Sequence, residues 1–386
     1  MSAMAEKPTG LLGLARKEGP FIAGVVTTVL FILYGKVWLA DLSDPLTTGL
    51  LFLWLFAAML WGAFGVVRHA DCLAELLGEP YGTLILTVAV ITIEVALISA
   101  IMLTGSQTPE LARDTMLAVI MIVLNLMVGL ALLIGGLRHG EQEFNFQGAR
   151  AYIGVLLPLA TLSLILPNFT HSTATPTLTT FQAVFFGSLT VLLYATFLGI
   201  QTMRHQSFFV QPTTMRAGVE GGDAAADTGG HGDHNPVNVP FHAAMLILTL
   251  VPIVLLSKKL AVLVDYGTGQ LGAPAALGGV LVAILVLAPE GLAALEAAGK
   301  NHLQRSVNIC LGSALATISL TVPAVVVIGL VTGDSVVLGL DATEMVMLGL
   351  TLLMSIVTFG ASRTTLLQGA AHLVVFVAYM VLIFDP

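Results

Sequence analysis

Long apolar stretches, separated by short polar segments, run through almost the whole chain. A helix needs roughly 20 apolar residues to cross the hydrocarbon of a bilayer, and a scan with that window predicts eleven membrane-spanning helices. Two of them, 151–167 and 241–257, are short and contain Pro158 and Pro252. The predicted helices span residues 21–40, 46–67, 82–104, 114–136, 151–167, 178–200, 241–257, 274–297, 305–330, 336–358 and 364–384.

The composition agrees with a membrane protein. Hydrophobic residues make up 56% of the 386 residues and charged residues 10%, whereas soluble domains carry about 25% charged residues. We therefore expect an all-α polytopic protein in a lipid bilayer. The net charge of −8 comes without a concentrated basic patch, so nucleic acid is not an expected partner. The two cysteines, Cys72 and Cys310, define no disulfide framework or metal cluster.

Lysine and arginine are distributed unequally between the two sets of connecting segments. If the N-terminus is inside, eleven of them fall on the cytoplasmic side and four on the other side. This bias predicts a cytoplasmic N-terminus. The four residues on the opposite side are Lys36, Arg113, Lys258 and Lys259.

One connection, residues 204–240, is long and rich in glycine and acidic residues. Such a tract buries too little apolar area to fold alone, so it is predicted to be a flexible cytoplasmic linker. It divides the chain into an N-terminal segment with the first helix (1–45), five helices in 46–203 and five more in 241–386. Because five is odd, the two groups enter the membrane in opposite directions, as in the inverted repeats of secondary transporters.

Glu94 and Glu290 lie inside two of the apolar stretches, each in the second helix of its five-helix group. Placing a carboxylate near the middle of a bilayer costs roughly 2.5–3.5 kcal/mol even on the lenient insertion scale, so such residues usually have a function. The helix with Glu94 is predicted to run outward and the helix with Glu290 inward. We therefore expect the two residues to form one cation- and proton-binding site at the midplane, with both as metal ligands.

Other oxygen-bearing residues and a proline add to this site. Pro289 removes a backbone donor beside Glu290 and leaves carbonyl oxygens free to ligate a cation. Carboxylate, hydroxyl, amide and carbonyl oxygens are the ligands of hard cations such as Ca²⁺ and Na⁺. Ordinary hydrogen bonding between helices is the alternative role for the hydroxyl and amide groups. The candidates are Ser313 and Asn125, followed by Thr92, Thr317 and Asn308.

The charge of the pair suggests a mechanism. Two ionised glutamates around one divalent cation are nearly neutral, and two protonated glutamates are neutral as well, whereas an empty ionised site is costly in a membrane. Cation and protons would then compete for the same oxygens, which is antiport. No cofactor is expected beyond the transported Ca²⁺, Na⁺ or K⁺ and the proton.

Four stretches carry a family resemblance. They read GEPYGTLILT (78–87), LAPEGL (287–292), LGSALATISLTVP (311–323) and GAAHL (369–373). They resemble the bacterial calcium/proton antiporters, the group that also exchanges sodium and potassium for protons, within the cation/calcium exchanger superfamily. The resemblance covers most of the chain and implies about eleven helices in two inverted repeats, located in the bacterial inner membrane.

The resemblance also implies roles for single residues. Glu94 and Glu290 match the cation-binding, proton-carrying acids, Ser313 matches a Gly-Ser motif of the second repeat, and Asn125 matches an Asn of the first. The chain also departs from the family pattern. The superfamily has Gly-Asn before its acids, where Val90-Ile91 and Val286-Leu287 stand here, and Met121 stands where the first repeat often has Ser. With fewer oxygens, a monovalent or mixed specificity is open beside calcium export.

Two other classes of function are the alternatives. One is an intramembrane enzyme that uses the glutamates as an acid–base pair, and the other is a passive cation channel. The predicted spans contain no zinc or serine-hydrolase motif and no acidic rings. We therefore expect an antiporter rather than an enzyme, with inorganic cations and protons as its partners.

Overall fold

Each of the eleven predicted spans overlaps a helix in the structure, a computed structural model that describes residues 18–77, 81–102, 110–173, 175–212, 239–271, 274, 276–333 and 336–385. Eight helices are long and apolar enough to cross a membrane, and three shorter apolar helices, Gly19–Leu33, Thr87–Ala100 and Ala342–Thr358, complete the set among these residues. The predicted all-α polytopic fold is confirmed. Most of the predicted linker, residues 213–238, lies outside the described residues, as do residues 1–17 and 78–80.

The first half begins with a leading helix and continues with five helical segments. The leading segment comprises α2 (Gly19–Leu33) and the short α3 (Gly35–Trp38), and α4 (Pro45–Leu77) and α5 (Tyr81–Met102) follow. The next segment runs from α6 (Leu111–Met121) through the π-helical turn η1 (Ile122–Met127) into α7 (Val128–His139). The last two are α8 (Phe146–Ala160), extended by η2 (Thr161–Ile165) and η3 (Leu166–Phe169), and α9 (Thr180–Gly199), extended by η4 (Ile200–Arg204).

The described part of the second half contains five helices and a short strand. After the 3₁₀ turn η5 (Gln206–Phe209), the described helices are α11 (Val239–Leu271), α12 (Ala276–Gly299), α13 (Leu303–Thr332), α14 (Ala342–Thr358) and α15 (Leu366–Phe384). Strands β1 (Gln142–Glu143) and β2 (Arg363–Thr364) form an antiparallel pair that the sequence analysis did not predict.

Two helices extend well beyond their predicted ends. Both α4 and α11 are 33 residues long. The predicted spans were shorter because polar residues end an apolar stretch, whereas the helix itself continues through them. Pro252, which the short seventh predicted span contains, lies inside α11. A proline is tolerated within a membrane helix when its surroundings compensate, and here its ring packs on the α2 glycine Gly24, where a Cβ would lie 3.1 Å from the Pro252 Cβ.

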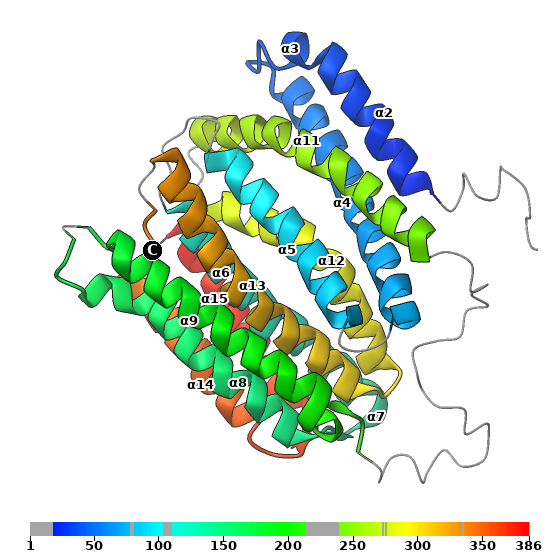
Figure 1. Ribbon diagram of the computed structural model, residues 1–386, viewed down its shortest axis with the longest axis vertical. Helices are drawn as coiled ribbons and strands as arrows, with labels where there is room; N and C mark the ends of the chain where they lie inside the picture. Colours follow the sequence, from blue (N-terminus) through cyan, green and yellow to red (C-terminus); the bar gives the residue numbers. More distant parts are fainter. Residues whose placement is uncertain are drawn as a thin grey trace, which may run out of the picture.

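The helices with the two glutamates lie between two hydrophobic clusters (Figure 1). One cluster is formed mainly by α6 to α9 and α13 to α15, and the other by α2, α4 and α11. On α5, Ile91 packs in the first cluster and Ile93 in the second, and on α12, Leu287 and Leu285 divide in the same way. Since both faces are buried, these helices read as apolar all round.

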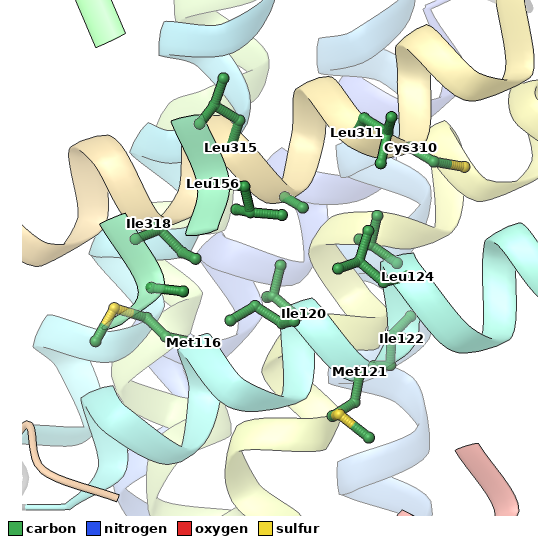
Figure 2. Close-up of a cluster of buried hydrophobic side chains, with 14 of the residues drawn as sticks. Met116, Ile120, Met121, Ile122, Leu124, Leu156, Cys310, Leu311, Leu315 and Ile318 are labelled. Atoms are coloured by element: carbon green, nitrogen blue, oxygen red, sulfur yellow. The ribbon is translucent and has the colours of Figure 1, made fainter. Parts of the chain in front are cut away.

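The larger cluster fixes the position of α13 against α6 and α8. Figure 2 shows Met116 and Ile120 of α6 meeting Leu156 of α8 and Leu311 and Ile318 of α13. All five side chains are completely buried. This packing holds the functional face of α13 in a fixed register beside α5 and α12.

Contacts between helices repeat when the two five-helix groups are exchanged. The first helices, α4 and α11, pack along each other. In this exchange α5 corresponds to α12, the α6–α7 segment to α13, and α9 to α15. The α5–α11 contact then corresponds to the α12–α4 contact, and the α6–α12 contact corresponds to the α13–α5 contact. The α7–α15 contact corresponds in the same way to the α13–α9 contact. This pattern, with five helices in each group, confirms the predicted inverted repeats.

The connecting segments gather at two opposite faces, as the predicted topology requires. At one face the Arg113 side chain donates to the Gly339 carbonyl at 3.0 Å, and Asn168 donates to the Leu340 carbonyl at 2.7 Å. At the other face β1 pairs with β2, and Arg363 forms an ion pair with Glu143 at 2.6 Å.

A polar cluster connects the leading helix to both five-helix groups. Glu18, just before α2, accepts a hydrogen bond from Arg68 on α4 at 2.7 Å and lies 3.0 Å from Nε2 of the buried His69. The other ring nitrogen of His69 lies 3.0 Å from Nδ1 of His242 on α11. These contacts hold α2, α4 and α11 together at one end.

The close approach of α12 to α6 gives a prediction about stability. A Cβ on Gly279 would lie 2.8 Å from the Thr115 nitrogen and 2.9 Å from the Asp114 carbonyl carbon. Overpacking of this kind costs about 1–3 kcal/mol, so Gly279→Ala should lower the melting temperature of the detergent-purified protein, followed by intrinsic fluorescence. Gly349→Ala on α14 is the control, since nothing lies within 4 Å of its Cβ position. Equal melting temperatures in the two variants would contradict the packing.

Candidate functional site

Glu94 lies in the middle of α5 and is completely buried. Its Oε2 accepts a hydrogen bond from the hydroxyl of Thr317 on α13 at 3.1 Å. Its Oε1 is buried and has no partner at hydrogen-bond geometry, although the buried Thr321 hydroxyl of α13 lies near the carboxyl group. Buried polar atoms are nearly always paired, and each exception needs an explanation such as a bound ion, a proton or a water. The unpaired oxygen makes Glu94 a candidate for binding an ion or a proton.

Glu290 occupies the corresponding place on α12, directly after Pro289. Its Oε2 is also buried without a hydrogen-bond partner. Ser313 lies within hydrogen-bonding reach of this carboxyl group, and the charge of Glu290 acts on Glu94. The structure thus brings together both predicted acids and two of the predicted hydroxyl groups, those of Ser313 and Thr317, on neighbouring helices.

A cavity of about 340 Å³ leads to these groups. One wall of the cavity is a face of α13 whose residues recur every three or four positions, and it extends from Arg305 to Thr317. Those 12 steps correspond to roughly 18 Å along a helix. Asp71 and Arg305 are exposed and mark the mouth, whereas Thr317 is buried at the inner end. Other parts of the wall come from α4, α5, α8, α9 and α12.

Between Glu94 and the opposite face of the protein, an apolar cluster closes the path. Ile98, one turn further along α5, packs with Ala112 of α6 and Val325 of α13, and all three are almost completely buried. Val336 packs against them from the segment before α14. Glu290 therefore lines a cavity that opens at the face that holds Arg305, and Glu94 lies behind its inner end, bonded to Thr317.

The helices that form this site match a known family model. The model described as sodium/calcium exchanger protein matches residues 47–203 and 241–384, both five-helix groups. The chain belongs to the sodium/calcium exchanger family. The predicted resemblance is confirmed, and the break between the two matched segments, 204–240, coincides with the predicted linker.

Individual relatives agree with this assignment. The exchanger is 39% identical to the sodium-potassium/proton antiporter ChaA of Escherichia coli over 368 residues, which cover 95% of this chain and 96% of that protein. It also resembles the structure of native YfkE, with a TM-score of 0.70 at 19% identity over 95% of this chain and 100% of the other. The structure of the H⁺/Ca²⁺ exchanger CAX gives a TM-score of 0.66 at 14% identity, covering 95% and 88%. These two structures support the fold, and the relatives are transporters rather than enzymes.

Asn125 points away from the two glutamates of the exchanger. Its amide nitrogen donates to the hydroxyl of Thr351 on α14 at 2.8 Å, and its oxygen lies 3.1 Å from Nδ1 of His372 on α15. Met127, two residues further along η1, faces α12 instead, near the Cβ position of Gly291. Asn125 thus connects α14 and α15 in this conformation, and its role as a cation ligand stays a prediction.

The secondary candidates divide between the site and other places. Thr92 donates to its own helix at the Val88 carbonyl and faces an apolar groove between α5 and α11. Asn308 lines the cavity, where it donates to the Phe209 carbonyl at 2.8 Å. Pro289 is buried inside α12 and cannot donate to the carbonyl one turn earlier.

Sequence reasoning missed several residues of the cavity wall. Asp71 falls outside the second predicted span, which ends at residue 67, whereas α4 continues past it. Gln201 and Tyr152 line the cavity and are joined by a hydrogen bond of 2.9 Å. The available signal was helical spacing, because Asp71 lies one turn after Val67, which lines the same wall.

The two threonines near Glu94 provide a matched test of the site. Thr317→Val removes the hydroxyl that donates to Glu94, a hydrogen bond worth about 1.5–3 kcal/mol when the acceptor is charged. Cation binding should therefore weaken by roughly tenfold or more, measured as the cation concentration that raises the melting temperature. Thr92→Val makes the same chemical change two residues from Glu94 but outside the cavity, so it should leave binding unchanged. Equal effects of the two substitutions would argue against this geometry.

Proposed function

We propose that this exchanger is a secondary cation/proton antiporter in which a cation and protons compete for Glu94 and Glu290. The observation that carries the proposal is the pair of buried carboxyl oxygens without partners, one on each glutamate, at the inner end of a cavity open to one face. Groups that bind a proton and a cation in turn need this arrangement, since neither ligand is permanent.

The energetics of burial support exchange rather than simple release. An unpaired charge removed from water is costly, and a bound proton or cation cancels that cost. Each carboxylate is neutralised by one proton or one monovalent cation, and the two together by one divalent cation. The loaded and the protonated site can therefore pass through the membrane interior, whereas the empty ionised site is disfavoured.

Na⁺ and K⁺ are the cations that we expect to be exchanged best. The name of the relative ChaA, which covers nearly all of this chain, refers to sodium and potassium. Ca²⁺ takes six to eight oxygen ligands, and neither the Asn125 nor the Thr92 side chain faces the carboxyl groups. Fewer protein oxygens remain for a divalent ion, although the two carboxylates still suit its charge.

The closed end of the cavity supports an alternating mechanism over a passive channel. A channel needs a continuous polar path, whereas Ile98, Ala112 and Val325 bury the far side of Glu94. With the N-terminus in the cytoplasm, as the excess of basic residues on that side favours, this conformation would be open to the cytoplasm. We propose a location in the bacterial inner membrane, where the proton gradient would drive the cation outward.

Transport by everted membrane vesicles with a pH-sensitive dye tests the proposal. Addition of Na⁺ or K⁺ should dissipate the proton gradient in vesicles with the native chain, with a smaller response to Ca²⁺. Glu94→Gln and Glu290→Gln should each abolish the response, because the amide can neither carry the proton nor neutralise the cation.

Glu296→Gln is the matched control. Glu296 lies on α12 like Glu290, but it is exposed and paired with Lys300 at 2.6 Å. This variant should exchange like the native chain, and immunoblots should show all three variants in the membrane. Exchange retained by Glu94→Gln or by Glu290→Gln would refute the shared site.

A further inference from the structure

The mouth of the cavity holds two opposite charges on different helices. Among the described residues that line the cavity, the charged ones are Asp71 on α4, Arg305 on α13 and Glu290 on α12. Asp71 and Arg305 are exposed, while Glu290 is half-buried further inside. Every cation that enters by this path passes the two charges at the mouth first.

Helical geometry places both charges along the path to the site. Asp71 follows Val67 by one helical turn, and both residues line the wall. Arg305 lies in the first turn of α13, roughly 18 Å along the helix from Thr317. The Asp71 charge acts on the Glu290 carboxyl, and the Glu290 charge acts on Glu94. Three carboxyl groups on three helices thus form a series from the mouth to the inner end.

The walls between these charges are mostly neutral. Near the mouth the wall contains the uncharged polar groups of Gln201 and Asn308, both held by hydrogen bonds. A cleft with low-dielectric walls concentrates the field of the few charges that it contains and changes the local concentration of an ion. One acid and one base at the mouth therefore affect an entering cation in opposite directions.

We propose that Asp71 attracts the cation at the cavity mouth, that Arg305 opposes this attraction, and that the two together set the apparent affinity of exchange. The inference rests on the proposed function and adds two specificity-determining residues to it. Asp71 raises the local concentration of the cation before the ion reaches Glu290. The electrostatic energy of an ion is proportional to its charge, and its local concentration depends exponentially on that energy. The factor by which Asp71 enriches a divalent cation is therefore the square of the factor for a monovalent cation.

The test measures initial rates of exchange against cation concentration in everted vesicles. Asp71→Asn should raise the half-saturating Na⁺ concentration roughly two- to tenfold, the order of effect expected for the loss of one charge that acts through a medium between water and protein. Arg305→Gln should lower it. The maximal rates should stay unchanged, because neither residue belongs to the site that carries the ion. Alkaline pH suits the measurement, since the same field also concentrates the competing protons.

Two further readouts separate an electrostatic role from a structural one. Both shifts should shrink when an inert salt raises the ionic strength to about 0.15 M, where charges are screened over about 8 Å. For vesicles that also transport Ca²⁺, the shift for Ca²⁺ should exceed the shift for Na⁺. Asp71→Glu, which retains the charge, should keep the native half-saturating concentration.

Controls at the same face of the molecule use an ion pair outside the cavity. Glu141→Gln and Arg363→Gln make the same changes of charge in an exposed pair that joins the α7–α8 and α14–α15 segments, and both should behave like the native chain. Shifts of the same sign for Asp71→Asn and Arg305→Gln, or an Asp71→Asn shift no larger than that of Glu141→Gln, would overturn the inference. If Asp71→Asn fails to reach the membrane, the direction of the Arg305→Gln shift decides. Failure of the native chain to exchange would instead refute the proposed function.

Discussion

The free energy of burying two carboxyl groups is the constraint on which the rest of this structure depends. Among the described residues, no basic side chain forms an ion pair with Glu94 or Glu290, and each of the two keeps one buried oxygen unpaired. In apolar surroundings such groups need a proton or a cation. The protein around them supplies hydroxyl groups from α13 and packs α5 and α12 between two hydrophobic clusters.

The inverted arrangement of the two groups of helices explains how the carboxyl groups meet. Helices that cross in opposite directions can each place their middle turn at the same depth. The counterpart contacts of α5 with α13 and of α12 with α6 hold these turns side by side. The resulting site is not symmetric in chemistry, because α13 offers Ser313 and Thr317 whereas η1 offers Met127 and turns Asn125 elsewhere.

Much of the fold follows from the sequence, because a membrane helix must be apolar over a fixed length. The two acids were equally evident, since each is a carboxyl group inside a long apolar stretch. The direction of Asn125 was not predictable, because the π-helical turn η1 alters which face each following residue presents. Asp71 was missed because a hydrophobicity window finds where an apolar stretch ends, whereas α4 continues beyond that point to Leu77. Strands of two residues, β1 and β2, are too short to leave a periodic pattern.

The pairing of β1 with β2 has a consequence for how the helices are grouped. It connects the α7–α8 segment of the first half to the α14–α15 segment of the second, and the Arg363–Glu143 ion pair reinforces it. Helices from both halves are thereby fastened into one unit, which shares the larger hydrophobic cluster. Packing therefore divides the described helices into that unit and a layer of α2, α4 and α11, and this division does not coincide with the boundary between the two halves.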